Sequence, residues 1–192
     1  MDPSTRCAFC GEPQAPAQLR REFELDFCEP CAVGQAEAAL RARGHSLISR
    51  EWTTRVRTNN SSHTIYHMSI DARPPEPLEV TVRFTREHAL HRLVKLFRHE
   101  VEVGDPLFDD FVYVKTRERP QAQALLRSSG VQSTLIDLVG RYDSIDLARG
   151  SVQIRHAATE QVLAADAMLA ACALLVHIDR IASGSPAHEP QS

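Results

Sequence analysis

Alternation between apolar and polar residues predicts most of the strands in this chain. The stretch from Leu47 to Ala72 is rich in Thr, Ile, Val, Trp and Tyr. The turn sequence Asn-Asn-Ser-Ser divides it, so it predicts a β-hairpin. After the breaker sequence Ala-Arg-Pro-Pro-Glu-Pro, apolar residues occupy every second position and predict a third strand with one buried face. These residues are Leu78, Val80, Val82 and Phe84.

Two later segments predict further strands. The sequence Gly-Asp-Pro at residues 104–106 predicts a turn directly before an alternating strand. The inward face of that strand carries either Phe111 and Tyr113 or their neighbours Val112 and Val114. A second hairpin is predicted to turn near residues 149–150. Its inward positions are Ile145, Leu147, Val152 and Ile154.

Segments with helical spacing of apolar residues lie between these strands. An Ala-rich helix is predicted over residues 32–43, where Gly44 follows in the usual C-terminal position. Further helices are predicted around residues 86–100, 125–126 and 131–139, and a long one spans about 159–181. This order of elements indicates an α+β fold, with a small N-terminal module and a mainly antiparallel sheet packed with helices.

Length and composition limit the class of protein. A chain of 192 residues can bury one substantial core beside a small metal-stapled module. The apolar fraction of 43% and the charged fraction of 24% are typical of a folded soluble protein. The net charge is −3 and no long run of Lys or Arg occurs, which argues against general affinity for nucleic acid. Abundant Arg and Ala are typical of a GC-rich bacterial genome.

The sequence predicts a cytoplasmic protein. Its first residues lack the basic start and the apolar stretch of a signal peptide. The most apolar segment, residues 163–181, is interrupted by Asp166, His177 and Asp179, so it predicts a buried helix and not a membrane span. In a reducing compartment, paired cysteines more often bind metal or perform redox chemistry than form structural disulfides.

Four cysteines near the N-terminus carry the most specific chemical signal. Cys7 and Cys10 form one Cys-x2-Cys pair, Cys28 and Cys31 form another, and seventeen residues separate the pairs. This spacing predicts a tetrahedral zinc site with four thiolate ligands. Gly11 directly after Cys10 suits the tight turn that such a pair requires. Because four thiolates complete the coordination shell, a structural Zn2+ is expected and not a catalytic one.

The sequences Cys-Ala-Phe-Cys-Gly and Phe-Cys-Glu-Pro-Cys-Ala, with the second pair before a predicted helix, resemble zinc-ribbon and treble-clef modules. The resemblance covers residues 7–43 and implies metal binding by all four cysteines. Two alternatives remain open. Cys28 and Cys31 resemble the redox pair of a thiol-disulfide oxidoreductase. The spacing also occurs in zinc-dependent nucleic-acid binders, although residues 1–43 hold five Arg against seven Asp plus Glu.

Three other groups of residues have ordinary structural explanations. The histidines of the segment 86–100, with the nearby Arg92 and Lys95, are expected on a solvated basic face, because their spacing does not provide a metal site. The acidic cluster at residues 105–110 is expected to make turns. Cys172 is expected to be a buried apolar side chain of the last helix. The histidines are His88, His91 and His99, and the acidic residues are Asp105, Asp109 and Asp110.

The segment from Phe97 to Thr116 resembles a second group of proteins. Its sequence is similar to a motif, Phe-x-Thr-Gly-Asp-Pro-x-Phe-Asp-x-x-Phe-x-Val, of uncharacterised bacterial domains. The likeness spans about residues 75–182, and Val103 replaces the Thr of the motif. It implies a fold and no activity. The matching residues are Phe97, Gly104, Asp105, Pro106, Phe108, Asp109, Phe111 and Val114, with Leu125 and Leu126 downstream.

These observations predict three regions. Residues 1–44 form a four-cysteine zinc-binding module, residues 45–182 form an α+β domain, and residues 183–192 form a disordered tail. No nucleophile elbow or Gly-rich phosphate loop occurs, so a catalytic role is not favoured. We expect a non-catalytic zinc-binding protein that binds a protein partner and neither nucleic acid nor a membrane. The sequence does not predict which protein it binds or in what oligomeric state.

Overall fold

A computed structural model describes residues 6–58, 61–76, 79–86, 101–148, 150–160 and 164–183. The helix predicted around residues 86–100 lies almost entirely outside these residues, with His88, His91 and His99. Residue Leu78 of the third predicted strand and most of the predicted tail also lie outside them.

The described chain alternates strands with helices, and it includes five α-helices. The N-terminal part contains a short 3-10 helix η2 (Pro16–Gln18), strands β1 (Leu19–Glu22) and β2 (Leu25–Cys28), a π-helical turn η3 (Cys31–Gln35) and helix α1 (Ala36–Ala42). The rest contains β3 (Ser46–Arg57), β4 (Ser62–Arg73), β5 (Val82–Arg86), α3 (Pro106–Phe111), β6 (Val112–Thr116), α4 (Arg119–Leu126), α5 (Ser129–Arg141), β7 (Ser144–Ala148), β8 (Ser151–Ala158) and α6 (Ala164–Ala182).

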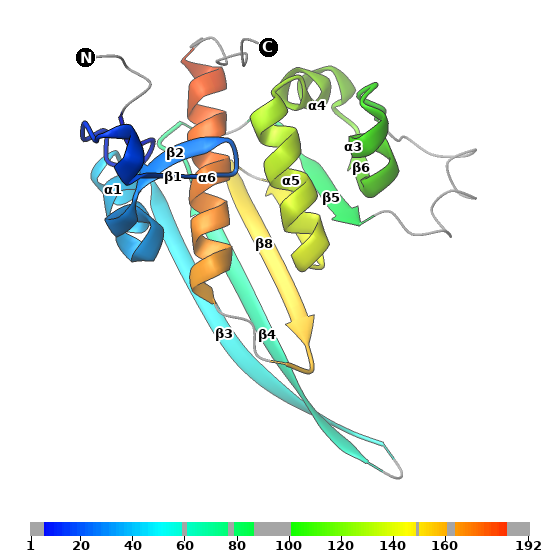
Figure 1. Ribbon diagram of the computed structural model, residues 1–192. Helices are drawn as coiled ribbons and strands as arrows, with labels where there is room; N and C mark the ends of the chain where they lie inside the picture. The colour runs from blue at the N-terminus through cyan, green and yellow to red at the C-terminus, as the bar shows by residue number, and fades with distance from the viewer. Residues whose placement is uncertain are drawn as a thin grey trace.

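The strands form two antiparallel sheets. A two-stranded sheet joins β1 to β2, and a six-stranded sheet has the order β3-β4-β8-β7-β5-β6. Helices α5 and α6 lie across one face of the large sheet, and β1 and β2 lie beside α6 (Figure 1). The predicted α+β class and the mainly antiparallel sheet are therefore confirmed.

A row of apolar side chains crosses the large sheet on the face that the helices cover. The strand register pairs each member with the next, and all five are buried. This alternation of buried and solvated positions confirms the inward faces predicted for the second hairpin and for β5, because side chains along a strand point to opposite faces in turn. The row consists of Ile70, Ile154, Ile145, Phe84 and Val114.

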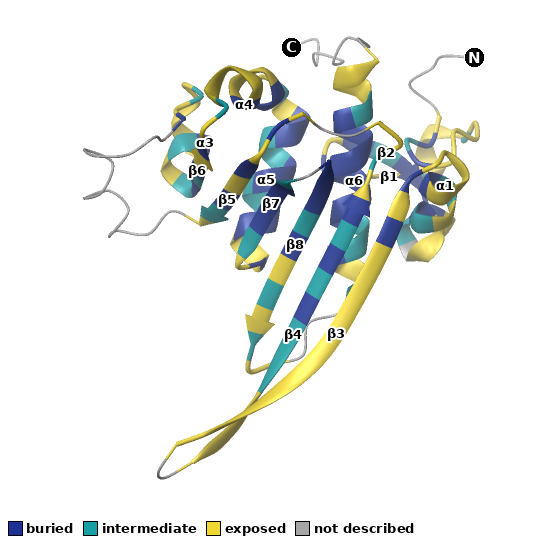
Figure 2. Cartoon of the chain, turned by 180° about the vertical axis from the view of Figure 1, so that it is seen from behind, coloured by how far each residue is buried: buried dark blue, intermediate teal, exposed yellow. Residues whose placement is uncertain are grey.

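The hairpin of β3 and β4 extends well beyond the part of β4 that pairs with the rest of the sheet. Its twelve residue pairs run without interruption from Ser46–Arg73 to Arg57–Ser62. Strand β8 pairs with β4 only from Tyr66 to Ala72, so the end of the hairpin is two-stranded. That end projects away from the helices, and β3 is exposed along almost its entire length (Figures 1 and 2).

The segment 104–116 corrects one prediction. A short helix, α3, separates the Gly-Asp-Pro turn from the strand, which begins only at Val112. Asp105 caps this helix, because its carboxylate accepts hydrogen bonds from the N–H groups of Leu107 and Phe108. Two alternatives were predicted for the inward face of β6, Phe111 with Tyr113 or Val112 with Val114. The second is correct, because Val112 and Val114 are buried.

Candidate metal centre

The first cysteine pair lies in a tight loop closed by backbone hydrogen bonds. The N–H of Gly11 donates to the carbonyl of Cys7 over 2.9 Å, and the N–H of Cys7 donates to the carbonyl of Glu12 over 3.0 Å. Gly11 has a φ of +77°, a value that suits glycine, so the turn predicted after Cys10 is confirmed. The loop directs the sulfurs of Cys7 and Cys10 towards β2.

The second pair lies where the small hairpin passes into a helix. Cys28 is the last residue of β2, and Cys31 begins the π-helical turn that leads into α1. A two-residue turn joins β1 to β2, and both of its residues, Phe23 and Glu24, have positive φ. This geometry is that of a type I′ turn, which matches the twist of a hairpin. The hairpin thereby returns the chain to the first pair.

The four sulfur atoms gather at one point. All of them lie within 4.8 Å of one another. The sulfurs of Cys10 and Cys28 are 3.8 Å apart, and no disulfide joins any of the cysteines. A tetrahedral site with Zn–S bonds of about 2.3 Å has sulfur–sulfur edges of about 3.8 Å. The four side chains could therefore hold a metal ion without a large rearrangement.

The surroundings of the sulfurs affect the ionisation of each thiol differently. Burial opposes ionisation of Cys7, but hydrogen bonds from the backbone N–H groups of Cys10, Cys28 and Phe9 outweigh it and lower the Cys7 pKa to about 7. Burial raises the pKa of Cys31, and the neighbouring sulfurs of Cys28 and Cys7 raise it further. Burial likewise raises the pKa of Cys10. Crowded thiolates repel one another, and a bound cation would offset that repulsion.

This arrangement differs from that of a thiol-disulfide pair. In the redox alternative, Cys28 and Cys31 would act together and the first pair would have no role. Instead, the N–H of Cys28 donates to the Cys7 sulfur over 3.4 Å, and the Cys28 sulfur contacts that of Cys10. The two pairs therefore form one four-sulfur group. Cys7, Cys28 and Cys31 are buried and Cys10 is exposed, so the group lies at the edge of the module.

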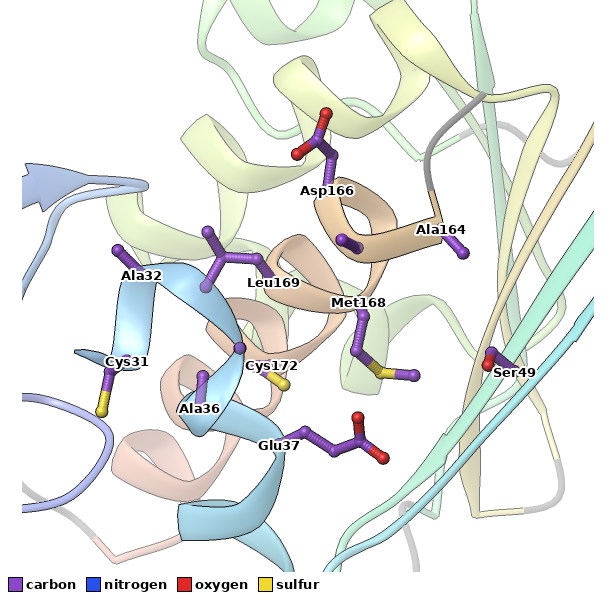
Figure 3. A pocket seen from close by; sticks show the side chains of 12 residues that line it. Cys31, Ala32, Ala36, Glu37, Ser49, Ala164, Asp166, Met168, Leu169 and Cys172 are labelled. Atoms are coloured by element: carbon purple, nitrogen blue, oxygen red, sulfur yellow. The ribbon is translucent and has the colours of Figure 1, made fainter. Parts of the chain in front are cut away.

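Cys172 takes no part in this group. Its side chain is fully buried in α6, and burial raises its pKa to about 12. It lines a groove of about 330 Å³ between the η3–α1 segment and α6. Figure 3 shows the Cys31 side chain pointing away from Cys172, and the carboxylates of Glu37 and Asp166 lying far apart. Glu37 already pairs with Arg41, so these residues offer no convergent set of polar groups.

The acidic cluster at residues 105–110 has a structural role at two of its three positions. Asp105 caps α3, and the carboxylate of Asp109 accepts hydrogen bonds from the N–H groups of Val103 and Gly104, both over 2.9 Å. Within the described ranges, the only group of three or more metal-ligating side chains is the four-cysteine group. No described helix combines the length and apolar character needed to cross a bilayer.

Sequence reasoning missed the residues that join the module to the large domain. The Nε2 atom of buried His177 lies 2.8 Å from the carbonyl oxygen of Phe23, in the β1–β2 turn. In the same turn, the Glu24 carboxylate accepts a hydrogen bond from Ser129. The Nε2 atom of His45, just after α1, lies 2.8 Å from the carboxylate of Asp179 in α6. His177 within the most apolar segment of the chain was the available signal, since a buried polar group needs a partner.

Comparison of the chain with protein-family models, with curated proteins and with solved structures gave no match. The likeness of the segment 97–116 to the bacterial Gly-Asp-Pro motif therefore has no support from these comparisons.

Proposed function

We propose that this protein is a non-catalytic protein-binding module whose N-terminal segment is stabilised by a structural Zn2+ ion. The gathering of four cysteine sulfurs within 4.8 Å carries the proposal. A loop with two cysteines, a hairpin and a helix that begins at the second pair is the arrangement of a treble clef. Cys7, Cys10, Cys28 and Cys31 would be the ligands, and they would leave no open coordination position for a substrate.

Zinc suits this donor set because soft thiolate ligands in a tetrahedral arrangement select Zn2+ or an iron–sulfur centre over hard cations. The module also needs such an ion. Its strands have only four residues each, and α1 has seven, so little apolar surface can be buried. In comparable peptides, zinc contributes about 10–16 kcal/mol of apparent binding free energy, which acts as folding free energy.

The β3–β4 hairpin supplies the surface on which we expect a protein partner to bind. Ile48, Trp52 and Val56 lie on the face turned away from the helices, and they are 45%, 48% and 41% exposed. Trp52 stacks on His67 of β4, with ring centroids 5.1 Å apart. These residues form a stripe along β3, which we call the apolar stripe. Exposed aromatic and aliphatic side chains gathered in this way are typical of protein-binding surfaces.

The zinc module would fix the base of this hairpin. Helix α1 packs beside the start of β3, where the guanidinium of Arg41 donates a hydrogen bond to the carbonyl of Leu47. The contact of His45 with Asp179 joins the same corner to α6. Loss of the metal would therefore loosen the attachment of the hairpin as well as the module.

Metal analysis of the purified protein tests the first half of the proposal. We expect one zinc ion per chain, with four thiols that react only after chelation. Cys7→Ser should lower the zinc content strongly, whereas Cys172→Ala should leave it unchanged. A chain that contains no zinc, or an iron–sulfur chromophore in its place, would contradict the structural zinc site. Fast reduction of insulin by the zinc-free protein would favour the redox alternative.

Site-specific cross-linking in cells tests the second half. A photo-reactive amino acid at Trp52 should capture a protein and give a product of defined mass. The same group at Gln123, an exposed position of α4, is the matched control and should give none. A nuclease-sensitive product at Trp52 would favour a nucleic-acid binder. Equal labelling at both positions would show that the hairpin has no special role.

A further inference from the structure

Strand β3 presents a free edge of the large sheet. Two hydrogen bonds identify which of its backbone groups point outward. Arg41, which lies outside the sheet, bonds to the carbonyl of Leu47, and the N–H of Thr58 bonds inward to the carbonyl of Ser61. The backbone N–H and C=O groups of successive residues point to opposite edges of a strand. The N–H and C=O groups of every second residue from Leu47 therefore point to the free edge. The next five are Ser49, Glu51, Thr53, Arg55 and Arg57.

These five residues lack most of the features that prevent an edge strand from pairing, although Glu51, Arg55 and Arg57 are charged. All are exposed, and no described residue makes a hydrogen bond to their outward N–H and C=O groups. Natural edge strands are usually short, or carry Pro, Lys or a bulge that prevents pairing. Strand β3 has twelve residues in uninterrupted register and contains neither Pro nor Lys. Its edge is therefore well suited to pair with another strand.

We propose that a second copy of this chain occupies the edge, with the two β3 strands antiparallel about a two-fold axis at Thr53. The charges on the edge are self-complementary in this register. Glu51 lies opposite Arg55 of the copy, and the axis repeats this pair as Arg55 opposite Glu51. Opposite charges directly across from each other stabilise an antiparallel pair. The two six-stranded sheets then become one continuous sheet.

This register uses the whole free edge. The five outward residues pair among themselves and exchange about ten backbone hydrogen bonds, two for each pair. An axis one residue earlier, at Trp52, would place Glu51 opposite Thr53 of the copy. No opposite charge on the copy would then face the Glu51 carboxylate. An axis at Thr54 would place Glu51 opposite Arg57, but Ser49 would then face residue 59, beyond the end of β3.

The apolar stripe would become continuous across the two copies. In the proposed register, Trp52 lies opposite Thr54 of the copy and diagonal to the copy's Trp52, a separation that aromatic side chains can bridge. Each indole would lose part of its 48% exposure. Trp52 is the only tryptophan of the chain, so its fluorescence reports this contact directly.

This inference rests on the proposed function, in which the hairpin binds protein, and it names the partner. Sedimentation velocity of the zinc-loaded protein over a range of concentrations should show a monomer–dimer equilibrium. Tryptophan emission should shift to longer wavelength as dilution dissociates the dimer. Arg55→Glu should weaken dimerisation about tenfold or more, because each Glu51 would then face a like charge. Glu51→Arg should have a similar effect.

The double variant Glu51→Arg with Arg55→Glu restores opposite charges at both positions and should recover the wild-type dimer. Arg57→Glu is the matched control, since Arg57 faces uncharged Ser49 and its change should have little effect. A monomer at every concentration would overturn the inference. A dimer that ignores Arg55→Glu, or fails to recover in the double variant, would overturn the register and with it the proposed interface. If cross-linking at Trp52 captured a different protein while the purified chain stayed monomeric, the proposed function would stand without the dimer.

Discussion

The cysteine module and the β3–β4 hairpin are neighbours in the sequence, but different forces hold them. In the module, four sulfurs lie within 4.8 Å of one another, and the proposed zinc ion would link the Cys7–Cys10 loop to the second cysteine pair through them. In the hairpin, twelve residue pairs are held in register by a regular ladder of backbone hydrogen bonds. The module therefore depends on a few atoms, whereas the hairpin depends on many weak contacts, none of which is essential. The two regions should respond to single substitutions in opposite ways.

Their attachment to the large domain differs as well. The module packs on α6 through η3 and α1, and the turn of its small hairpin adds polar contacts to α6 and α5, where the carbonyl of Phe23 meets His177 and Glu24 meets Ser129. The inner half of the β3–β4 hairpin pairs with β8, and among the described residues no buried polar contact joins its outer half to the rest of the chain. A region that docks through a few buried polar contacts can be detached by changing them. A region that is part of a sheet can only be shortened or frayed.

The largest effect is expected from Cys28→Ser. This change removes one of four thiolates from the proposed zinc site, and the site contributes about 10–16 kcal/mol in comparable peptides. We expect substoichiometric zinc after dialysis and loss of amide protection across β1, β2 and α1. The amides of β7 and β8 should keep their protection. Hydrogen exchange with mass spectrometry and metal analysis would measure both.

Cys172→Ala provides the matched control for this prediction, because Cys172 is buried but lies outside the sulfur group. It should retain one zinc ion and protection of the module. If Cys28→Ser also kept the module protected, the buried apolar side chains there would suffice for folding, and the contrast between the two regions would be wrong.

Gly130→Ala in α5 is expected to have a smaller effect and to lower the free energy of unfolding by about 1–3 kcal/mol. A Cβ atom at Gly130 would lie 2.2 Å from the His177 ring, so the ring must move and its contact with Phe23 would break. Gly140→Ala in the same helix is the control. A Cβ there would meet only Phe111 at 3.7 Å, and Ala is the better helix former by about 1 kcal/mol.

Urea unfolding of the zinc-loaded proteins would measure both changes. Gly130→Ala should lower the free energy of unfolding and increase exchange in β1 and β2, while Gly140→Ala should raise it or leave it unchanged. A neutral Gly130→Ala would mean that the module does not depend on this contact.

Local patterns were sufficient to predict the contents of both regions. Cysteine spacing predicted the group that the four sulfurs form. Residue composition and the turn sequence Asn-Asn-Ser-Ser predicted the β3–β4 hairpin, although not which of its faces is buried. The helix α3 was missed, although Asp105 before Pro106 is a regular helix start, because the same residues also form turns. The β1–β2 turn was not foreseen in detail, since Phe23 and Glu24 replace the Gly or Asn that usually adopts positive φ.

Long-range relationships could not be predicted. Nothing in the local pattern indicates that β8 lies beside β4, or that His177 contacts a residue 154 positions earlier. Such contacts follow from the packing of the entire sheet and helix layer. The free edge of β3 is another example, because an alternating strand has the same sequence pattern whether it lies inside a sheet or at its edge.

A pH effect smaller than that of Gly130→Ala is expected at the docking contact between His177 and Phe23. Desolvation lowers the pKa of His177, and the hydrogen bond to Phe23 acts in the opposite direction. The folded state therefore binds a proton less readily than the unfolded state. The contribution of neutral His177 to the free energy of unfolding should be fully present above about pH 6.5, the ordinary pKa of histidine. It should be lost as the pH falls through the lowered pKa of the folded state.

The variant His177→Gln isolates this contribution, because glutamine can still donate to the Phe23 carbonyl but does not titrate. Acid protonates thiolates and would release a bound zinc ion from both proteins, so the informative quantity is the difference between the unfolding free energies of each protein at pH 7.5 and at pH 5.5. The wild type should lose more stability than the variant. Equal losses would mean that His177 does not become charged on unfolding.

Trp52→Ala is expected to have the smallest effect. At low protein concentration it should lower the free energy of unfolding by about 0.2–1 kcal/mol. Its only described ring contact is the stack on His67, and nearly half of the side chain is already in solvent. The remaining eleven residue pairs of the hairpin are unchanged, so zinc content and module protection should match the wild type. Hydrogen exchange should increase only near Trp52 and His67. An effect as large as that of Gly130→Ala would show that the hairpin also depends on a single contact. The difference between the two regions would then be one of location and not of how each is held together.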